Sequence, residues 1–184
     1  MLRLRLLILA ALCVTAASCA SAPIENYHTV AEGILQRGAQ PTEEGFRQLK
    51  AAGIRTVVDL RRGDRREEEA CVRDLGMDYV NIPCRAESPS DHSAAQFLQI
   101  VLDARRQPVF VHCQAGRDRT GTVVAVYRIV VQGWTAQRAI DELHEHQGVV
   151  RLFLPQIPEY LEHLDASRLN AVPQTQPSVA LPPG

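Results

Sequence analysis

Residues 109–121 read Val-Phe-Val-His-Cys-Gln-Ala-Gly-Arg-Asp-Arg-Thr-Gly. The apolar run at the start predicts a buried strand that ends at His112. The long apolar stretch 122–131 predicts a helix that begins near Arg119. The chain from Cys113 to Arg119 must therefore form a tight loop whose backbone N–H groups face inward, at the positive end of the helix. Such a loop is suited to binding an anion.

The residue types in this stretch fit phosphate chemistry. Oriented N–H groups, the helix dipole and a nearby guanidinium all favour the thiolate of Cys113, which is the nucleophilic form. Arg119 can bind two phosphate oxygens at once, which lysine cannot do. Gly116 supplies the backbone freedom of a curled loop, and Gly121 is expected to let the helix pack close to the strand. Thr120 is expected within hydrogen-bond reach of the sulfur.

The pattern His112-Cys113-x-x-Gly116-x-x-Arg119-Thr120-Gly121 resembles the Cys-x5-Arg signature of the cysteine-dependent protein tyrosine phosphatase superfamily, nearest to its dual-specificity-like branch. A Gln-Pro-Thr start at residues 40–42 and the segment 53–61 extend the resemblance to about residues 33–165. The resemblance implies hydrolysis of phosphate monoesters through a cysteinyl-phosphate intermediate, without cofactor or metal. It also implies roles for eight residues. Cys113 attacks, Arg119 and the loop residues Gln114, Ala115, Gly116 and Arg117 hold the phosphoryl group, and His112 and Thr120 support the loop and the thiolate.

The general acid departs from the usual pattern of that superfamily. The loop 83–91 should carry an aspartate, and Ala86 stands in its place. Glu87 and Asp91 are alternative acids on this loop, although Asp91 or Ser90 also suits the start of a helix.

A third candidate acid, Asp118, lies inside the signature. The run Cys-x-x-Gly-Arg-Asp-Arg-Thr is similar to loops of secreted bacterial tyrosine and lipid phosphatases and of myotubularins, where the loop aspartate is thought to donate the proton. Asp118 is our first choice for the acid, and capping of helix 119–132 is the alternative role. Arg117, which stands where those loops have lysine, favours a substrate with more than one phosphate.

Strand and helix patterns alternate along the rest of the chain. Strands are predicted at 33–37, 54–60 and 77–82, and helices after Thr42, at 65–75, from 91 to about 106, from Thr135 to about 147, and near 159–168. We therefore expect a single α/β domain, a mostly parallel central sheet flanked by helices, with the protein-tyrosine-phosphatase fold over residues 24–170. The charged face of helix 65–75 is interpreted as solvated surface. Asp59 and Arg61, at the C-terminal end of strand 54–60, are interpreted as a solvated turn and a salt bridge, and lining of the pocket is the alternative.

The N-terminus indicates export. Residues 1–18 combine two arginines, an apolar core and small residues, as in a secretory signal peptide. The sequence Ala-Ala-Ser-Cys ending at Cys19 resembles a lipoprotein cleavage box, so we expect a lipidated, periplasm-facing membrane protein, with the outer membrane as one destination. The alternative is ordinary cleavage and a secreted or periplasmic protein. Residues 171–184, rich in proline, are expected to be a disordered tail.

Three cysteines, Cys71, Cys84 and Cys113, remain after the leader in a compartment that permits disulfides. A Cys71–Cys84 bridge is one possibility, protection of Cys113 by either of them is another, and two buried thiols is the third.

The formal net charge of −1 gives no general case for nucleic acid. Expected substrates are phosphotyrosine, phosphoserine or phosphothreonine proteins, or a phosphoinositide-like lipid or inositol phosphate. One alternative is a catalytically weak phosphate-binding module, although a pure binder has no need of the thiolate. The other is rhodanese or arsenate reductase chemistry on a similar loop.

Overall fold

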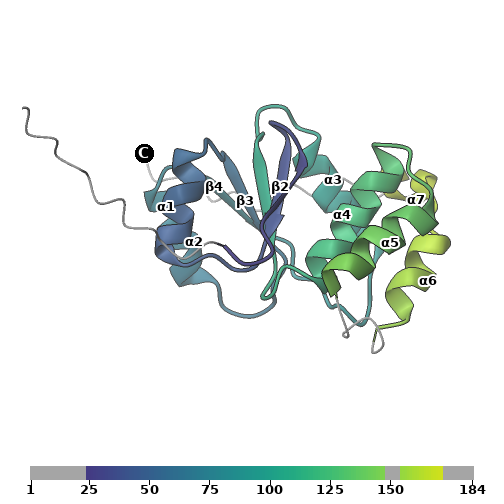
Figure 1. Cartoon of the computed structure of the whole chain (residues 1–184). Coiled ribbons are helices and arrows are strands. Elements are labelled where there is room, and N and C mark those ends of the chain that lie inside the picture. The colour runs from purple at the N-terminus through teal and green to yellow at the C-terminus, as the bar shows by residue number, and fades with distance from the viewer. Residues whose placement is uncertain (1–23, 148–153, 172–184) are drawn as a thin grey trace, which may run out of the picture.

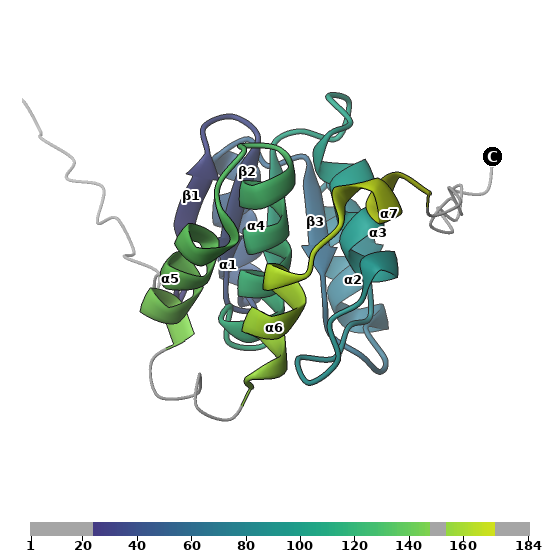
Figure 2. The same ribbon diagram turned by 90° about the vertical axis from the view of Figure 1, so that its right-hand side faces the viewer.

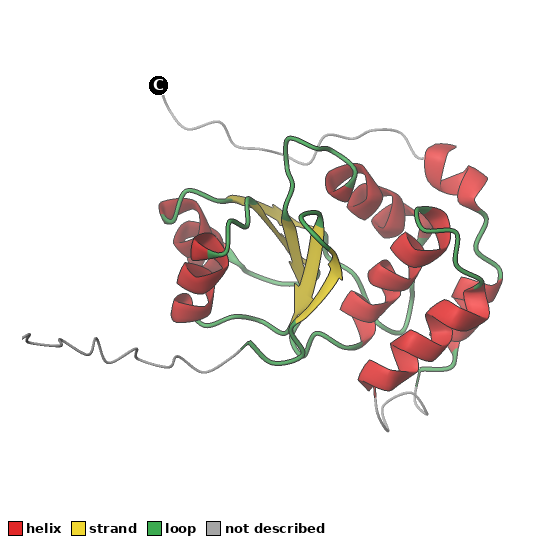
Figure 3. Ribbon diagram, turned by 45° about the horizontal axis from the view of Figure 1, so that its top comes forward, coloured by secondary structure: helices red, strands yellow, loops and turns green. Residues whose placement is uncertain are grey.

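In the computed structural model the described residues are 24–147 and 154–171, and they form three layers (Figure 1). A central sheet separates helices α1 and α2 on one side from helices α3 to α7 on the other (Figures 2 and 3). The strands are β1 (His28–Ala31), β2 (Leu35–Gly38), β3 (Thr56–Asp59), β4 (Asp78–Asn81) and β5 (Val109–His112). The helices are α1 (Glu43–Ala51), α2 (Arg66–Asp74), α3 (Asp91–Val101), α4 (Asp118–Val130), α5 (Ala136–Gln147), α6 (Gln156–Glu162) and α7 (Ala166–Ala171).

The sheet has the order β1-β2-β5-β3-β4, with β5 at its centre. β5 pairs in parallel with β2 and with β3, and β3 pairs in parallel with β4, which confirms the mostly parallel sheet. β1, which lies before the first predicted strand, pairs antiparallel with β2. In this register Gly38 and Asp59 lie on either side of His112. The ends of three strands therefore meet where the signature loop begins.

Both faces of the sheet are covered by apolar side chains. Val58 and Val111 belong to the core under α3 to α6, whereas Val57 and Phe110 belong to the core under α1 and α2. This alternation along each strand follows from the period of two of a β-strand. Helix α4 is buried from Thr120 through Tyr127, as a helix that is apolar on all sides requires.

Helix starts follow local chemistry. The Thr42 hydroxyl accepts a hydrogen bond from the backbone N–H of Gly45 at 3.1 Å, so the predicted cap of α1 is confirmed. The prediction of a single helix near 159–168 is wrong. The chain forms α6 and α7 instead, because the Asp165 carboxylate accepts the N–H of Ser167 at 2.9 Å and starts a new helix. Helix α3 ends at Val101 rather than near residue 106.

The leader 1–18, Cys19 and residues 172–184 lie outside the described residues. Among the residues described, no helix combines the length and the apolar character needed to cross a membrane.

Candidate active site

The signature loop connects β5 to α4, and its carbonyl groups are bound from outside. The carbonyls of Gln114, Ala115 and Gly116 accept hydrogen bonds from the Gln40 backbone N–H at 3.2 Å, the Asn26 Nδ2 at 2.8 Å and the Arg37 guanidinium at 2.7 Å, respectively. The Cys113 carbonyl lies 3.1 Å from His112 Nδ1, and the Arg117 carbonyl accepts from Gly121 N at 2.6 Å. Since successive carbonyls point outward, the N–H groups of the same peptides are left facing the centre of the loop. This arrangement is an anion-binding nest.

Arg37 and Gly116 fix the back of the loop. The Arg37 side chain is only 2% exposed, and burial lowers its pKa to about 10, so it still carries its positive charge at neutral pH. The electrostatic interactions with Glu142 and Cys113 raise this pKa and offset part of the effect of burial. Gly116 has φ +68°, and a Cβ there would lie 2.5 Å from Ala39 N. The loop therefore requires glycine both for its backbone conformation and for its close approach to the end of β2.

Cys113 is buried, at 3% exposure, and Arg119 lines a hollow in front of the loop. This hollow has a volume of about 410 Å³ and is lined by Arg61, Arg62, Arg65, Cys84, Arg85, Ala86, Glu87, Gln114 and Arg119. With five arginines and one acidic side chain, it is strongly basic. The segments around residues 61–65 and 84–87 form its walls, so these two segments set the depth of the pocket. A basic hollow of this kind concentrates anionic ligands.

Behind the nucleophile lies a buried ionic cluster. Arg61 binds the Asp59 carboxylate through two hydrogen bonds of 2.8 and 2.7 Å, and it also contacts Glu68 of α2. Burial alone would raise the pKa of Asp59, but the hydrogen bonds from Arg61 and the proximity of His112 hold it below its ordinary value. The salt bridge expected between Asp59 and Arg61 is thus confirmed. The solvated turn is wrong for these two residues, because both side chains are buried, and Arg61 also lines the hollow, as the alternative had it. The solvated interpretation of helix 65–75 is wrong for Glu68, whose side chain is 9% exposed.

Asp59, Glu68 and His112 offer three potential metal ligands within 4.8 Å of one another. The Arg61 guanidinium already binds both carboxylates, so it holds the position that a cation would need. These three side chains therefore suit a buried ion-pair cluster with Arg61 better than a metal site.

The three candidate acids occupy different places. Glu87 lines the basic hollow and lies 3.7 Å from Arg85. Asp91 is the first residue of α3, Ser90 is the cap of that helix, and Asp91 interacts with the Tyr160 hydroxyl, whose pKa is raised mainly by burial and also by Asp91. Asp118 is the first residue of α4, while the cap position belongs to Arg117, which makes no side-chain cap bond. Asp118 is therefore not the cap of its helix.

The structure differs from two expectations for the end of the signature, at Thr120 and Gly121. Gly121 faces the Leu143 side chain of α5, so it brings α4 close to α5 and not to the strand. The Thr120 side chain is fully buried, and its hydroxyl has no hydrogen-bond partner within the described part of the chain. Its bond to the sulfur is thus not formed in this state and stays a prediction.

The cysteines of the described residues, Cys71, Cys84 and Cys113, are all free. Burial raises the pKa of Cys84 to about 11, so this thiol stays protonated at neutral pH. Cys84 therefore lines the hollow in front of the loop as a neutral thiol and is not a competing nucleophile.

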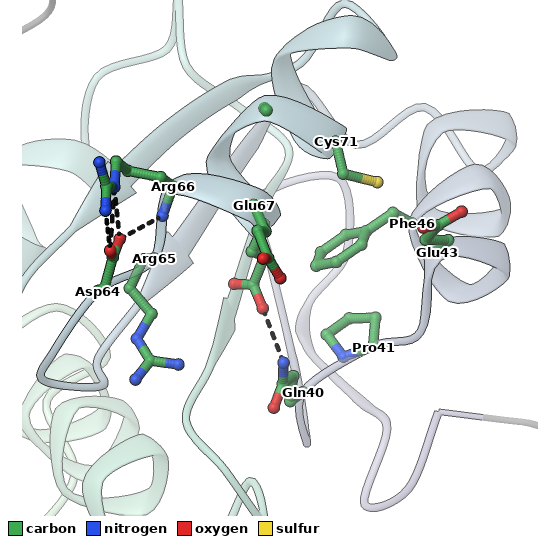
Figure 4. Close-up of a pocket in the computed structure, with 11 residues that line it drawn as sticks. Gln40, Pro41, Glu43, Phe46, Asp64, Arg65, Arg66, Glu67 and Cys71 are labelled. Carbon is green, nitrogen blue, oxygen red and sulfur yellow. Dashed lines mark hydrogen bonds and ion pairs between the residues drawn. The ribbon is translucent and has the colours of Figure 1, made fainter.

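A larger hollow, of about 800 Å³, lies between α1 and α2. Figure 4 shows Phe46 and Cys71 extending into it from these two helices, and Gln40 at its edge. Neither Cys113 nor Arg119 lines it, so its size does not make it the reaction site.

Four residues of the site were not anticipated from the sequence. Asn26, Arg37 and Gln40 hold the loop from positions that are 74 to 89 residues away in the chain, and Glu68 lies against His112. Glu68 and Val72, one helical turn apart, share the inner face of α2, which was the available signal.

A parallel strand, a cysteine-initiated nest and an arginine at the start of the following helix define the cysteine-dependent protein tyrosine phosphatase superfamily, and this chain is a member of its dual-specificity-like branch. Residues 15–151 match the family model described as "PTP-NADK: DSP-PTPase phosphatase fused to NAD+ Kinase", and the chain belongs to this family.

Similar proteins agree with this assignment. The dual specificity protein phosphatase TpbA of Pseudomonas aeruginosa PAO1 is 34% identical over 115 residues, which are 62% of this chain and 51% of TpbA. The crystal structure of a Cys-to-Ser variant of P. aeruginosa TpbA in complex with pTyr is 28% identical, with a TM-score of 0.64, over 75% of this chain and 84% of that one. Inositol diphosphatase DSP3 of Arabidopsis thaliana is 26% identical over 134 residues, 70% of this chain and 65% of the relative. The chain spans about half the length of TpbA, its more similar curated relative.

Proposed function

We propose that the protein is a cysteine-dependent phosphatase that hydrolyses phosphate monoesters. The observation that carries this proposal is the outward anchoring of the loop carbonyls by Asn26, Arg37 and Gln40, which leaves a preformed ring of N–H groups around Cys113. A ring that is rigid before substrate binds stabilises the charge that develops on the phosphoryl oxygens without reorganisation.

The reaction proceeds in two steps. The Cys113 sulfur attacks phosphorus, the ester P–O bond breaks, and the leaving oxygen takes a proton from the general acid. Water then attacks the cysteinyl phosphate, the same carboxylate takes a proton from that water, and the S–P bond breaks to restore the thiolate and release phosphate. Arg119 and the loop N–H groups hold the phosphoryl oxygens through both steps.

The substrate is a phosphorylated protein or an inositol phosphate or phosphoinositide. The name of TpbA and its pTyr complex favour a phosphoprotein, while the name of DSP3 favours an inositol diphosphate. Arg62, Arg65 and Arg85 in the hollow supply positive charge beyond what one phosphate needs. Comparing kcat/KM for a phosphotyrosine peptide and an inositol pyrophosphate separates the two classes.

The test of the function is hydrolysis of para-nitrophenyl phosphate by the full chain, combined with acid quenching and mass spectrometry. Turnover together with a phosphate adduct on the peptide that contains Cys113 is the expected result. Binding of phosphate esters without turnover or adduct would instead favour the phosphate-binding module.

Asp118 is our first choice for the general acid. Replacing it with asparagine should lower kcat by about 10² to 10⁴ for an alkyl phosphate, whose leaving oxygen needs the proton, and much less for para-nitrophenyl phosphate. The alkaline limb of the pH profile, which reports loss of the acid's proton, should disappear.

Glu87→Gln and Asp91→Asn are the matched variants for this comparison, because each removes one carboxylate of the other loop. If the leaving-group dependence appears in Glu87→Gln and not in Asp118→Asn, the acid is Glu87.

We also propose that the protein is exported and anchored to a membrane through lipid on Cys19. Only the sequence pattern of residues 1–19 supports this. Incorporation of a labelled fatty acid in the expressing cell, lost in Cys19→Ser, tests it, and an unlabelled protein would indicate ordinary cleavage.

A further inference from the structure

The buried side chain of Glu68 joins α2 to the nucleophile through two routes. Its Oε2 accepts hydrogen bonds from Gln40 Nε2, at 3.0 Å, and from Arg61. Gln40 in turn binds the signature loop, because Gln114 Nε2 donates to Gln40 Oε1 at 3.0 Å. The other carboxylate oxygen, Oε1, lies 3.2 Å from His112 Nε2. These two atoms do not form an aligned hydrogen bond in the described structure, and their contact is an ion pair when His112 is protonated.

Both nitrogens of His112 face acceptors. Nδ1 lies 3.1 Å from the Cys113 carbonyl oxygen, which can only accept, and Nε2 faces a carboxylate oxygen, which also accepts when ionised. A neutral imidazole has one N–H, and it would place a lone pair against one of these oxygens. Only the imidazolium form, in which both nitrogens carry a proton, presents a proton on the side of each oxygen.

The charge balance of the cluster leads to the same protonation state. Asp59 and Glu68 contribute two negative charges and Arg61 one positive charge, which leaves −1. A protonated His112 brings the sum to zero, and buried charges are stable when they are paired. The other surroundings of the ring are the Phe46 and Phe110 rings, at 6.4 and 5.8 Å between centroids, and Tyr79 reaches the cluster by donating to Asp59 at 2.8 Å. Apart from these groups and Cys113 itself, no titratable side chain is shown against the ring in the described structure.

We propose that Glu68 is a positioning residue that keeps His112 doubly protonated beneath the signature loop, so that a buried cation supports the Cys113 thiolate. The proposal rests on the proposed function only in taking Cys113 as the nucleophile. Glu68 acts through His112 and does not touch the substrate.

The Glu68→Gln variant makes a definite prediction about the ring. Gln40 and Arg61 both donate to the Oε2 position, so the amide oxygen must occupy that position. The amide NH₂ group then faces His112 Nε2, which must become an acceptor. His112 in this variant is thus expected to be neutral, with its single proton on Nδ1.

The test is ¹⁵N NMR of histidine-labelled full chain at neutral pH, because protonated and bare ring nitrogens have well-separated shifts. The chain has six histidines, so the His112 signals are assigned by their absence in His112→Asn. We expect two protonated nitrogens in the wild type and in Glu67→Gln, the same change at the exposed neighbouring glutamate. We expect one bare nitrogen in Glu68→Gln.

A second readout follows the thiolate directly. Alkylation of Cys113 by iodoacetamide, followed by mass spectrometry, should be about tenfold slower in Glu68→Gln than in Glu67→Gln, because one neighbouring positive charge is lost. A neutral His112 in the wild type overturns the proposal even if Glu68→Gln does not fold. An imidazolium in both proteins, or unchanged alkylation, overturns it as well. Neither readout requires turnover, so failure of this proposal is distinct from failure of the phosphatase function.

Discussion

Replacing Cys113 with serine is expected to lower kcat for para-nitrophenyl phosphate by a factor of about 10⁴ or more. The hydroxyl has nearly the same shape as the thiol, but it is not ionised at neutral pH and is a far weaker nucleophile. The outward anchors of the loop do not involve the sulfur, so the nest should still bind phosphate esters. Turnover and isothermal titration with a non-hydrolysed phosphonate measure the two properties separately.

Cys84→Ser is the matched control for this change, because Cys84 lines the hollow in front of the loop and its raised pKa keeps it a neutral thiol. We expect turnover within about twofold of the wild type for a variant that only removes this buried sulfur. Comparable activity in Cys113→Ser, or loss in Cys84→Ser alone, would show that the nucleophile has been assigned to the wrong residue.

Gly116→Ala should have the second largest effect, since it deforms the loop without changing any charge. The new Cβ would overlap the carbonyl group of Gly38 and lie 2.5 Å from Ala39 N, and these are backbone atoms at the end of β2. Alanine is also strained at φ +68°. We expect a loss of about 2 to 4 kcal/mol in the free energy of unfolding and a loss of most turnover, because the bond from Arg37 to the Gly116 carbonyl cannot keep its geometry.

The comparison variant is Gly121→Ala, in which the Cβ overlaps the end of the Leu143 side chain and otherwise lies at ordinary contact distance, 3.7 Å, from Arg37 Nη2. A flexible side chain can change rotamer, so this variant should lose less stability and keep most of its activity. Urea unfolding and turnover of both variants provide the measurement. Equal effects of the two substitutions would contradict the view that Gly116 is needed for contact with β2.

The parts of the site that follow from neighbouring residues were predictable from the sequence. The strand ending at His112, the loop, the helix after it and the Thr42 cap each depend on a few consecutive residues and were found. The acidic side chain that faces inward was not found. Within Glu67-Glu68-Glu69 the spacing of four residues from Glu68 to Val72 marks Glu68 as the residue on the inner face of α2. That it meets His112 follows from where α2 is placed on the sheet, which no local pattern contains.

The same reason applies to Arg37. Arginine is the commonest basic residue of this chain and is normally a surface residue. Its burial depends on the parallel pairing of β2 with β5, which joins residues that are 74 positions apart in sequence. The sequence alone could not choose among the three candidate acids for a related reason. The path of loop 83–91 over the hollow depends on the rest of the fold and not on the sequence of the loop alone.

The anchors of the loop carbonyls have a consequence for how activity appears during folding. Asn26 reaches Ala115 across 89 positions of the chain and Arg37 reaches Gly116 across 79. Contacts of such length form late, after the entropy of closing long segments has been overcome. A chain that has formed β5 and α4 but has not yet docked its first strands holds the cysteine and the arginine without a shaped ring between them. Hydrolysis should therefore arise in one step at the end of folding, and recovered activity on refolding should follow the fully native population and not helix content.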